Sequence, residues 1–208
     1  MSMQWSAFDD PVHDSQRAYR QLLSTMAEPG TVEDMLESPL RPEDAAIGAA
    51  CWATLLTLCD LDTRVWLTPE LAAGGLGEGL RFHTGSRLVD TPAEADFALV
   101  TPATLADPTR VFNEGSDIYP DRSTTLLVVL ERLDTEGPWR LQGPGIPGFR
   151  RLGIGEGNAL MNRLAANQSR FPRGLDAILT CGARLAAVPR STRITSSRVE
   201  EADPCMSQ

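Results

Sequence analysis

The 208-residue sequence contains no lysine, so all 19 of its basic residues are arginines. A pyridoxal-phosphate enzyme forms its Schiff base on a lysine, and a Walker A loop uses a lysine to bind the β and γ phosphates. The chain alone therefore cannot carry out either chemistry. Histidine is also scarce, because His13 and His83 are its two occurrences and neither lies in a GxSxG or HExxH motif. We therefore assign no catalytic residue and no cofactor from the sequence.

Cysteine clusters and long apolar runs are missing too. The four cysteines are far apart, with no CxxC pair and no nearby histidine, which argues against structural zinc and a disulfide framework. No apolar stretch approaches the roughly 20 residues of a membrane helix. The first residues have neither the basic start nor the apolar stretch of a secretory signal. These features predict a cytoplasmic protein without a metal site or a membrane contact.

Charge is distributed unevenly along the chain. The net charge of −9 argues against nucleic-acid binding, which draws most of its affinity from phosphate neutralisation. Residues 140–198 nevertheless contain ten arginines and two acids, Glu156 and Asp176, whereas the rest contains nine arginines and 26 acids. Arginine binds phosphate and carboxylate through two parallel hydrogen bonds. The basic third therefore predicts an anionic ligand or an acidic partner surface.

Helical and strand patterns alternate without repeats or a linker-like segment, which favours a single α/β domain with a mixed sheet over residues 1–195. Residues 196–208 are polar and predict a flexible C-terminal tail. The patterns predict helices over 14–27, 42–59, 69–80, 103–111 and 156–169. They predict strands over 31–36, 64–67, 81–84, 97–100, 124–130, 139–142, 175–180 and 184–188. A turn at Gly137-Pro138 should pair 139–142 with the preceding strand, and a turn at Cys181-Gly182-Ala183 should pair the last two strands.

An ordered set of short motifs spans residues 8–194. Its members are Phe8-Asp9-Asp10-Pro11-Val12, Ser15-Gln16, Tyr19-Arg20, Met26-Ala27-Glu28-Pro29-Gly30, Leu56-Thr57-Leu58-Cys59-Asp60, Ala95-Asp96-Phe97-Ala98, Tyr119-Pro120, Ser123-Thr124-Thr125-Leu126, Leu141-Gln142-Gly143-Pro144-Gly145-Ile146, Phe171-Pro172-Arg173-Gly174-Leu175-Asp176 and Val188-Pro189-Arg190-Ser191-Thr192. In this order they resemble the H-subunit family of the carbon-phosphorus lyase core complex, which bacteria use to degrade phosphonates.

The resemblance implies a three-layer α/β/α sandwich, similar to the large domain of pyridoxal-phosphate transferases but without their cofactor lysine. It also implies an accessory subunit that works with G, I, J and L subunits and forms a homodimer when isolated. The implied step couples a phosphonate to the ribose C1 of ATP, releases adenine and leaves a ribose 1-phosphonate 5-triphosphate.

The candidate site residues come from two similar segments of the basic third, residues 171–176 and 188–193. Arg173, Arg190 and Arg193 follow or precede predicted strands, where loops carry function. Together with Asp176, which would orient one guanidinium, and the hydroxyl of Thr192, they predict a shared anion grip. The alternative is that the arginines are solvated or pair with nearby acids.

Two further segments have the composition of anion sites. Ser15 and Gln16 open the first predicted helix, where free amides attract anions, although simple capping explains the serine equally well. The glycine-rich run 143–146 is better interpreted as a turn than as a phosphate loop.

Three functional classes remain open from the sequence. The leading one is an assembly subunit of the lyase complex, whose basic third meets an acidic partner or lies near a phosphonate or nucleotide. The second is a stand-alone nucleotide- or phosphonate-binding transferase with an arginine clamp. The third is a protein that binds pyridoxal phosphate without covalent attachment.

Overall fold

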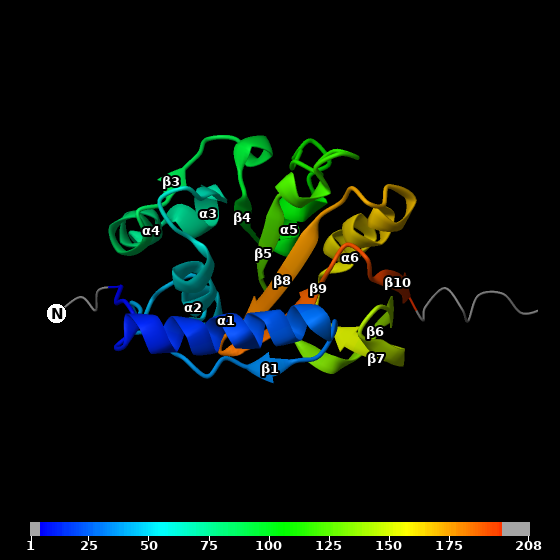
Figure 1. The fold of residues 1–208 in the computed structure, drawn as a ribbon, viewed down its shortest axis with the longest axis horizontal. Helices are drawn as coiled ribbons and strands as arrows, with labels where there is room; N and C mark the ends of the chain where they lie inside the picture. Colours follow the sequence, from blue (N-terminus) through cyan, green and yellow to red (C-terminus); the bar gives the residue numbers. More distant parts are fainter. Residues whose placement is uncertain (1–4, 197–208) are drawn as a thin grey trace, which may run out of the picture.

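Short aliphatic runs form the centre of the molecule. In the computed structural model, which describes residues 5–196, they build a seven-stranded sheet in the order β1-β9-β8-β5-β4-β2-β3 (Figure 1). Five strands are parallel: β2 (Arg64–Leu67), β3 (Arg87–Leu88), β4 (Phe97–Val100), β5 (Thr125–Val129) and β8 (Asp176–Cys181). The antiparallel β9 (Arg184–Val188) and the edge strand β1 (Glu33–Asp34) complete a mixed sheet. Nearly continuous apolar strands are expected in a sheet that is covered on both faces.

Helices cover both faces of this sheet. On one face lie α1 (Pro11–Ala27), α2 (Ala49–Leu58), α3 (Pro69–Ala72) and α4 (Leu76–Thr84), packed on a core that includes Leu127 and Ile178. On the other face lie α5 (Pro102–Ala106) and α6 (Asn158–Ala165), packed on a core that includes Val128 and Leu179. Neighbouring residues of one strand therefore pack into the cores on opposite faces of the sheet, because side chains alternate between the two faces along a strand. Three 3-10 turns are η1 (Pro92–Glu94), η2 (Pro120–Arg122) and η3 (Ala166–Ser169).

A second, three-stranded antiparallel sheet lies beside α6. Its strands are β6 (Asp134–Gly143), β7 (Ile146–Gly153) and β10 (Arg193–Ser196), in the order β10-β6-β7, at the lower right of Figure 1. Its inner residues, among them Trp139, Leu141, Leu152 and Ile194, are buried in the same core as α6. The β6–β7 turn touches the end of α1, because a Cβ on Gly145 would lie 1.8 Å from the carbonyl oxygen of Ala27.

Several predicted elements are confirmed at the residue level. The predicted strands 64–67, 97–100 and 184–188 match β2, β4 and β9, and the turn at Gly182 joins β8 to β9. The run 143–146 is a turn, as interpreted. The helix predicted over 156–169 is α6 continued by η3.

Other predictions were wrong. The helix predicted over 69–80 is interrupted between α3 and α4, and the helix predicted over 103–111 ends at Ala106. Residues 81–84 are the end of α4 rather than a strand, because Gly85 adopts a φ of 73° and its amide caps the helix on Arg81. Gly137-Pro138 lies inside β6, which pairs with β7 and β10 rather than with the strand at 124–130. The helix predicted from residue 42 begins at Ala49, where Gly48 lets the chain approach Gly182 so closely that a Cβ would lie 2.3 Å from the Gly182 oxygen.

The predicted tail starts at residue 196, but Ser196 still belongs to β10, paired with Trp139; residues 197–208 lie outside the described part of the chain. Among the described residues, no helix combines the length and the apolar character needed to cross a membrane.

Candidate functional site

Arg190 and Asp176, two of the predicted site residues, form a largely buried ion pair at the amino ends of the parallel strands. Asp176 begins β8 and Arg190 follows β9, so the β8–β9 hairpin brings them together. The Asp176 carboxylate accepts from the Arg190 amide at 2.7 Å and from Nε at 3.1 Å, and it also pairs with Nη2. The other guanidinium hydrogen bonds go to the Ser123 hydroxyl at 2.6 Å and to the Pro120 carbonyl. Every guanidinium nitrogen thus has an acceptor within the chain, so this pair ties loops together.

Thr192 and Arg193 line a small pocket beside this pair. The pocket has a volume of about 330 Å³ and also includes Gln168, Phe171 and Pro144. Thr192 is 3% exposed, and its Oγ1 has no hydrogen-bond partner within residues 5–196. The Gln168 amide, with its oxygen turned toward Arg193, accepts from Nε at 2.8 Å and from Nη2 at 3.2 Å. Four of the predicted site residues therefore lie together here: Asp176, Arg190, Thr192 and Arg193. That they bind an anion stays a prediction.

The other predicted site residues lie apart from this pocket. Arg173 pairs with Asp117 at 3.2 Å on the surface. The first helix starts at Pro11 rather than at residue 14, so Ser15 lies one turn inside it and donates to the Pro11 carbonyl, while Gln16 is exposed. In Figure 1 the first half of α1 lies at the left and β10 at the right.

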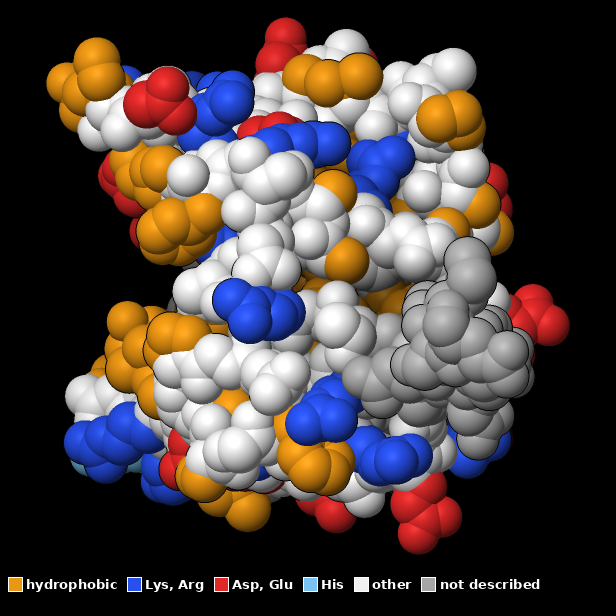
Figure 2. Space-filling model, turned by 90° about the vertical axis from the view of Figure 1, so that its right-hand side faces the viewer, with side chains coloured by type: hydrophobic (Ala, Val, Ile, Leu, Met, Phe, Trp, Pro, Cys, Tyr) orange, Lys and Arg blue, Asp and Glu red, His pale blue; other side chains and the backbone are white. Residues whose placement is uncertain are grey.

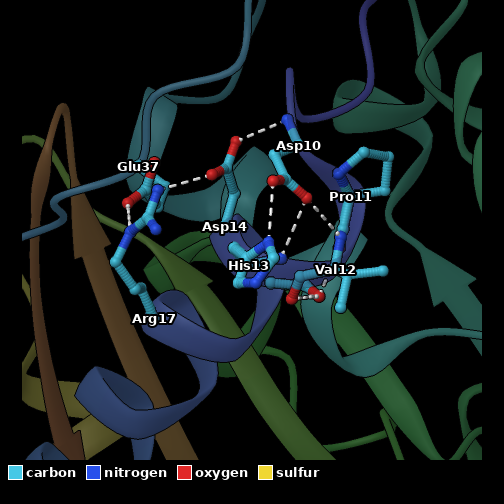
Figure 3. Close-up of polar contacts among 8 residues, drawn as sticks. Asp10, Pro11, Val12, His13, Asp14, Arg17 and Glu37 are labelled. Atoms are coloured by element: carbon cyan, nitrogen blue, oxygen red, sulfur yellow. Dashed lines mark hydrogen bonds and ion pairs between the residues drawn. The ribbon is translucent and has the colours of Figure 1, made fainter.

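The start of α1 is filled by acidic side chains (Figure 3). Asp10 accepts from the amides of Val12 at 3.2 Å and His13 at 3.1 Å, and its other oxygen lies 2.8 Å from His13 Nδ1. The hydrogen bonds from the His13 backbone and ring lower the pKa of Asp10. Asp14 accepts from the Asp10 amide at 2.9 Å and pairs with Arg17. The amides of this helix start therefore already have partners, and the surrounding carboxylates would repel an anion.

Four arginines of the basic third hold one loop, residues 107–123. Arg163 donates to the Arg110 carbonyl at 2.9 Å, and Arg170 pairs with Glu114. Arg173 reaches Asp117, and Arg190 reaches the carbonyl of Pro120. Part of the charge asymmetry seen in the sequence is therefore compensated inside the molecule by ion pairs of Arg170, Arg173 and Arg190, as the pairing alternative allowed.

The opposite ends of the parallel strands open onto the largest of the described cavities, about 830 Å³. Its walls come from the segments that follow β4 and β5, the approach to α2, the approach to α6 and the β8–β9 turn; they include Arg41, Glu43, Thr101, Glu131, Arg132 and Glu156. From β2 the chain goes to β3 through α3 and α4 on one face, whereas from β4 it goes to β5 through α5 on the other. The strand order reverses between β2 and β4. Leu71 of α3 and Thr101 after β4 both line the cavity, so it reaches this point outside the carboxyl ends, which is where open α/β sheets bind ligands.

Sequence reasoning assigned none of the residues of this carboxyl-edge cavity to a site. The signals were the segments directly after the strands at 97–100 and 124–130, together with the glycine-rich run 153–157, which supplies Gly155 and Glu156. Its volume lies in the range of ligand pockets. Both charge signs occur on its walls, so it suits a ligand with both anionic and donor groups.

Two of the cysteines are buried, and His83 is occupied. Burial raises the pKa of the Cys51 and Cys59 thiols to about 12, which keeps them protonated. His83 Nε2 lies 2.9 Å from the Trp5 carbonyl oxygen, and its ring packs edge-on against Trp52. Within residues 5–196, no group of three His, Cys, Asp or Glu side chains could hold a metal ion.

Comparison with known proteins gives one consistent result. The model of the family described as "Bacterial phosphonate metabolism protein (PhnH)" matches residues 6–195. A protein of Rhizobium meliloti (strain 1021), "Alpha-D-ribose 1-methylphosphonate 5-triphosphate synthase subunit PhnH", is 37% identical over 189 residues, which cover 90% of this chain and 94% of the relative. The "Putative C-P lyase subunit protein HtxG" of Stutzerimonas stutzeri is 28% identical over 181 residues, 86% of this chain and 85% of that protein. The motifs and these matches agree, and the chain belongs to the bacterial phosphonate metabolism protein (PhnH) family.

Proposed function

We propose that this chain is an accessory subunit of a ribose 1-phosphonate 5-triphosphate synthase. The observation that carries the proposal is the 37% identity to a synthase subunit over nearly the full length of both chains. In the proposed reaction a phosphonate oxygen bonds to the ribose C1 of ATP while the bond from C1 to adenine breaks. Adenine leaves with a proton, and the triphosphate stays on the ribose.

The contacts within the chain support an accessory role. The arginines nearest the predicted anion site are tied to Asp176, Pro120, Asp117 and Glu114. Both buried thiols are held protonated. We therefore assign the chemistry of the step to other subunits of G, I, J and L types, and we propose that the isolated chain is a cytoplasmic homodimer whose sandwich is similar to the large domain of pyridoxal-phosphate transferases.

Reconstitution tests this proposal directly. The other synthase subunits from the same organism are incubated with ATP and methylphosphonate, with and without the purified chain, and adenine release is followed by chromatography and the phosphonate ester by 31P NMR. We expect product formation to depend on the chain, and no product from the chain alone. Equal product without it would contradict the proposal.

The carboxyl-edge cavity favours a second candidate, in which the isolated chain binds a nucleotide or phosphonate itself. Its volume of about 830 Å³ is large enough for such a ligand. Isothermal titration with ATP and with methylphosphonate measures this. Ala103, an exposed residue on the cavity wall, is replaced by Trp to block the cavity, and Ala106→Trp on the same helix outside the wall is the control. Binding that survives Ala103→Trp would rule out the cavity as the site.

A further inference from the structure

The outer face of the three-stranded sheet carries three arginines. Along β6 the buried residues Trp139 and Leu141 point inward, so Arg140 and Gln142 point outward. Arg140 lies directly opposite Arg151 of β7 and opposite Thr195 of β10. Arg193 lies opposite Gln142, in the next outward row. Figure 2, which views the side of the molecule that carries this sheet, shows arginines in its lower part as well as in its upper part.

This arginine face has no internal compensation among the described residues. None of Arg140, Arg151 and Arg193 forms an ion pair within residues 5–196, in contrast to Arg150, which pairs with Glu28 at 3.1 Å from the same hairpin. Like charges directly opposite each other on neighbouring strands destabilise a sheet. The Arg140–Arg151 pair therefore lowers the stability of the isolated chain unless an anion lies over it.

The Arg140 side chain is held in place by an aromatic contact, but its hydrogen-bond donors are not all used. Its guanidinium stacks on the ring of Phe149, 4.2 Å from the centroid, and Phe149 remains 47% exposed. The Nε of Arg140 is buried and has no hydrogen-bond partner in the part of the chain that the structure describes. Fixed orientation, an exposed aromatic side chain and unused donor capacity are the properties of an interface anchor, and Arg and aromatic residues are enriched at such positions.

The shape of the arginine face favours a protein over a small ligand. The pockets at its two ends, one lined by Arg193 and the other by Arg151, have volumes of about 330 and 360 Å³. None of the pockets described among residues 5–196 is lined by Arg140 or Phe149, whereas small ligands are bound in concave sites that bury most of their area. We propose that the arginine face of β10-β6-β7 docks an acidic surface of another synthase subunit, one that places Asp or Glu carboxylates over Arg140 and Arg151 and an apolar group on Phe149. This inference rests on the proposed function.

Charge reversal tests the docking surface. The dissociation constant between the full chain and the purified assembly of the remaining synthase subunits is measured by biolayer interferometry at two salt concentrations. We expect Arg140→Glu/Arg151→Glu to weaken binding at least tenfold, and the wild-type affinity to fall as salt rises. Arg87→Glu makes the same change at the far edge of the large sheet, on β3, and should leave the affinity unchanged.

The outcomes separate the two proposals. If the wild type binds the subunit assembly and the double variant binds it equally well, the proposed docking surface is wrong, while the proposed function stands. A wild type that binds no subunit assembly removes the proposed function itself. If the double variant misfolds, the exposed single change Arg151→Glu replaces it, and its melting temperature shows that it folds. We expect this single change to weaken subunit binding at least threefold. Inorganic tripolyphosphate is titrated in parallel, and its binding to the arginine face without any loss of subunit affinity in the variants would overturn the proposal in favour of a ligand site.

Discussion

The two edges of the parallel sheet use polar side chains in opposite ways. At the amino ends, Asp96 before β4 binds Arg64 of β2, and Asp176 of β8 binds Arg190. At the carboxyl ends, Arg41 lines a cavity of about 830 Å³ together with Arg132, which pairs with Asp134. The amino edge is closed by contacts between loops, whereas the carboxyl edge leaves room for a ligand. An arginine-rich segment therefore indicates anion binding only where its donors are not already used inside the chain.

The sharpest test of the closed edge is removal of Arg190. Its side chain and that of Asp176 are 15% and 17% exposed, so Arg190→Ala leaves a largely buried carboxylate without its partner. We expect a loss of about 3 to 5 kcal/mol in the free energy of unfolding, measured by urea denaturation. The double variant Asp176→Ala/Arg190→Ala should recover part of this loss, because no uncompensated charge remains. A change below about 1 kcal/mol would show that the amino edge does not depend on this pair.

Asn167 makes the next largest contribution to the closed edge. Its side chain donates to the Leu175 carbonyl at 2.9 Å and accepts from the Leu175 amide at 3.0 Å, both in a buried setting. Asn167→Ala leaves both backbone groups unsatisfied and should cost about 1 to 3 kcal/mol. Thermal unfolding followed by circular dichroism measures the loss. The exposed neighbour Gln168, changed to Ala, should have little effect on the melting temperature.

Acid should weaken the amino edge through Asp96. Burial alone would raise the pKa of this carboxyl, but hydrogen bonds from the side chain and the backbone of Arg64 outweigh it and hold the pKa below the ordinary 3.8. Because the folded-state pKa is depressed, the stabilisation is present above pH 3.8 and is lost as the pH falls through the folded-state value. The pair is partly exposed, so the effect should stay below about 1 kcal/mol.

Unfolding curves between pH 6 and 3 for the wild type and Asp96→Asn measure this contribution. The variant should be less stable at pH 6, and the gap should narrow at the acid end. A gap that widens as the pH falls would contradict the direction of the pKa shift.

The smallest expected effect belongs to Arg173. It pairs with Asp117 at the surface, where the two side chains are 45% and 81% exposed. Such pairs contribute about 0 to 1 kcal/mol, so Arg173→Ala should change the melting temperature little. A loss of stability as large as that of Arg190→Ala would contradict the distinction between arginines in buried ion pairs and arginines in exposed ones. Ligand binding that disappears in Arg173→Ala would instead favour the predicted anion grip.

Local patterns predicted the elements that local physics determines. The strands at 64–67 and 97–100 were found because short apolar runs bounded by polar turns fit a buried parallel sheet. The β6–β7 hairpin was mispaired, because Gly137-Pro138 looks like a turn locally but is absorbed by a register shift within β6. The joining of Asp176 to Arg190 was anticipated as the orienting of a guanidinium. The acceptors Pro120 and Ser123 could not be predicted, since they come from a loop about 70 residues away in the sequence.

The contact between Gly145 and the end of α1 makes two distant sequence segments into one unit. The Ala27 carbonyl occupies the space of a Gly145 side chain, and Arg150 donates to the Pro29 carbonyl at 3.0 Å. Residues 26–30 and 143–150 therefore form a single joint between the large sheet's helical layer and the small sheet. In an alignment of relatives, exchanges in these two segments should covary, and a relative that has a side chain at position 145 should carry a rerouted chain after its first helix.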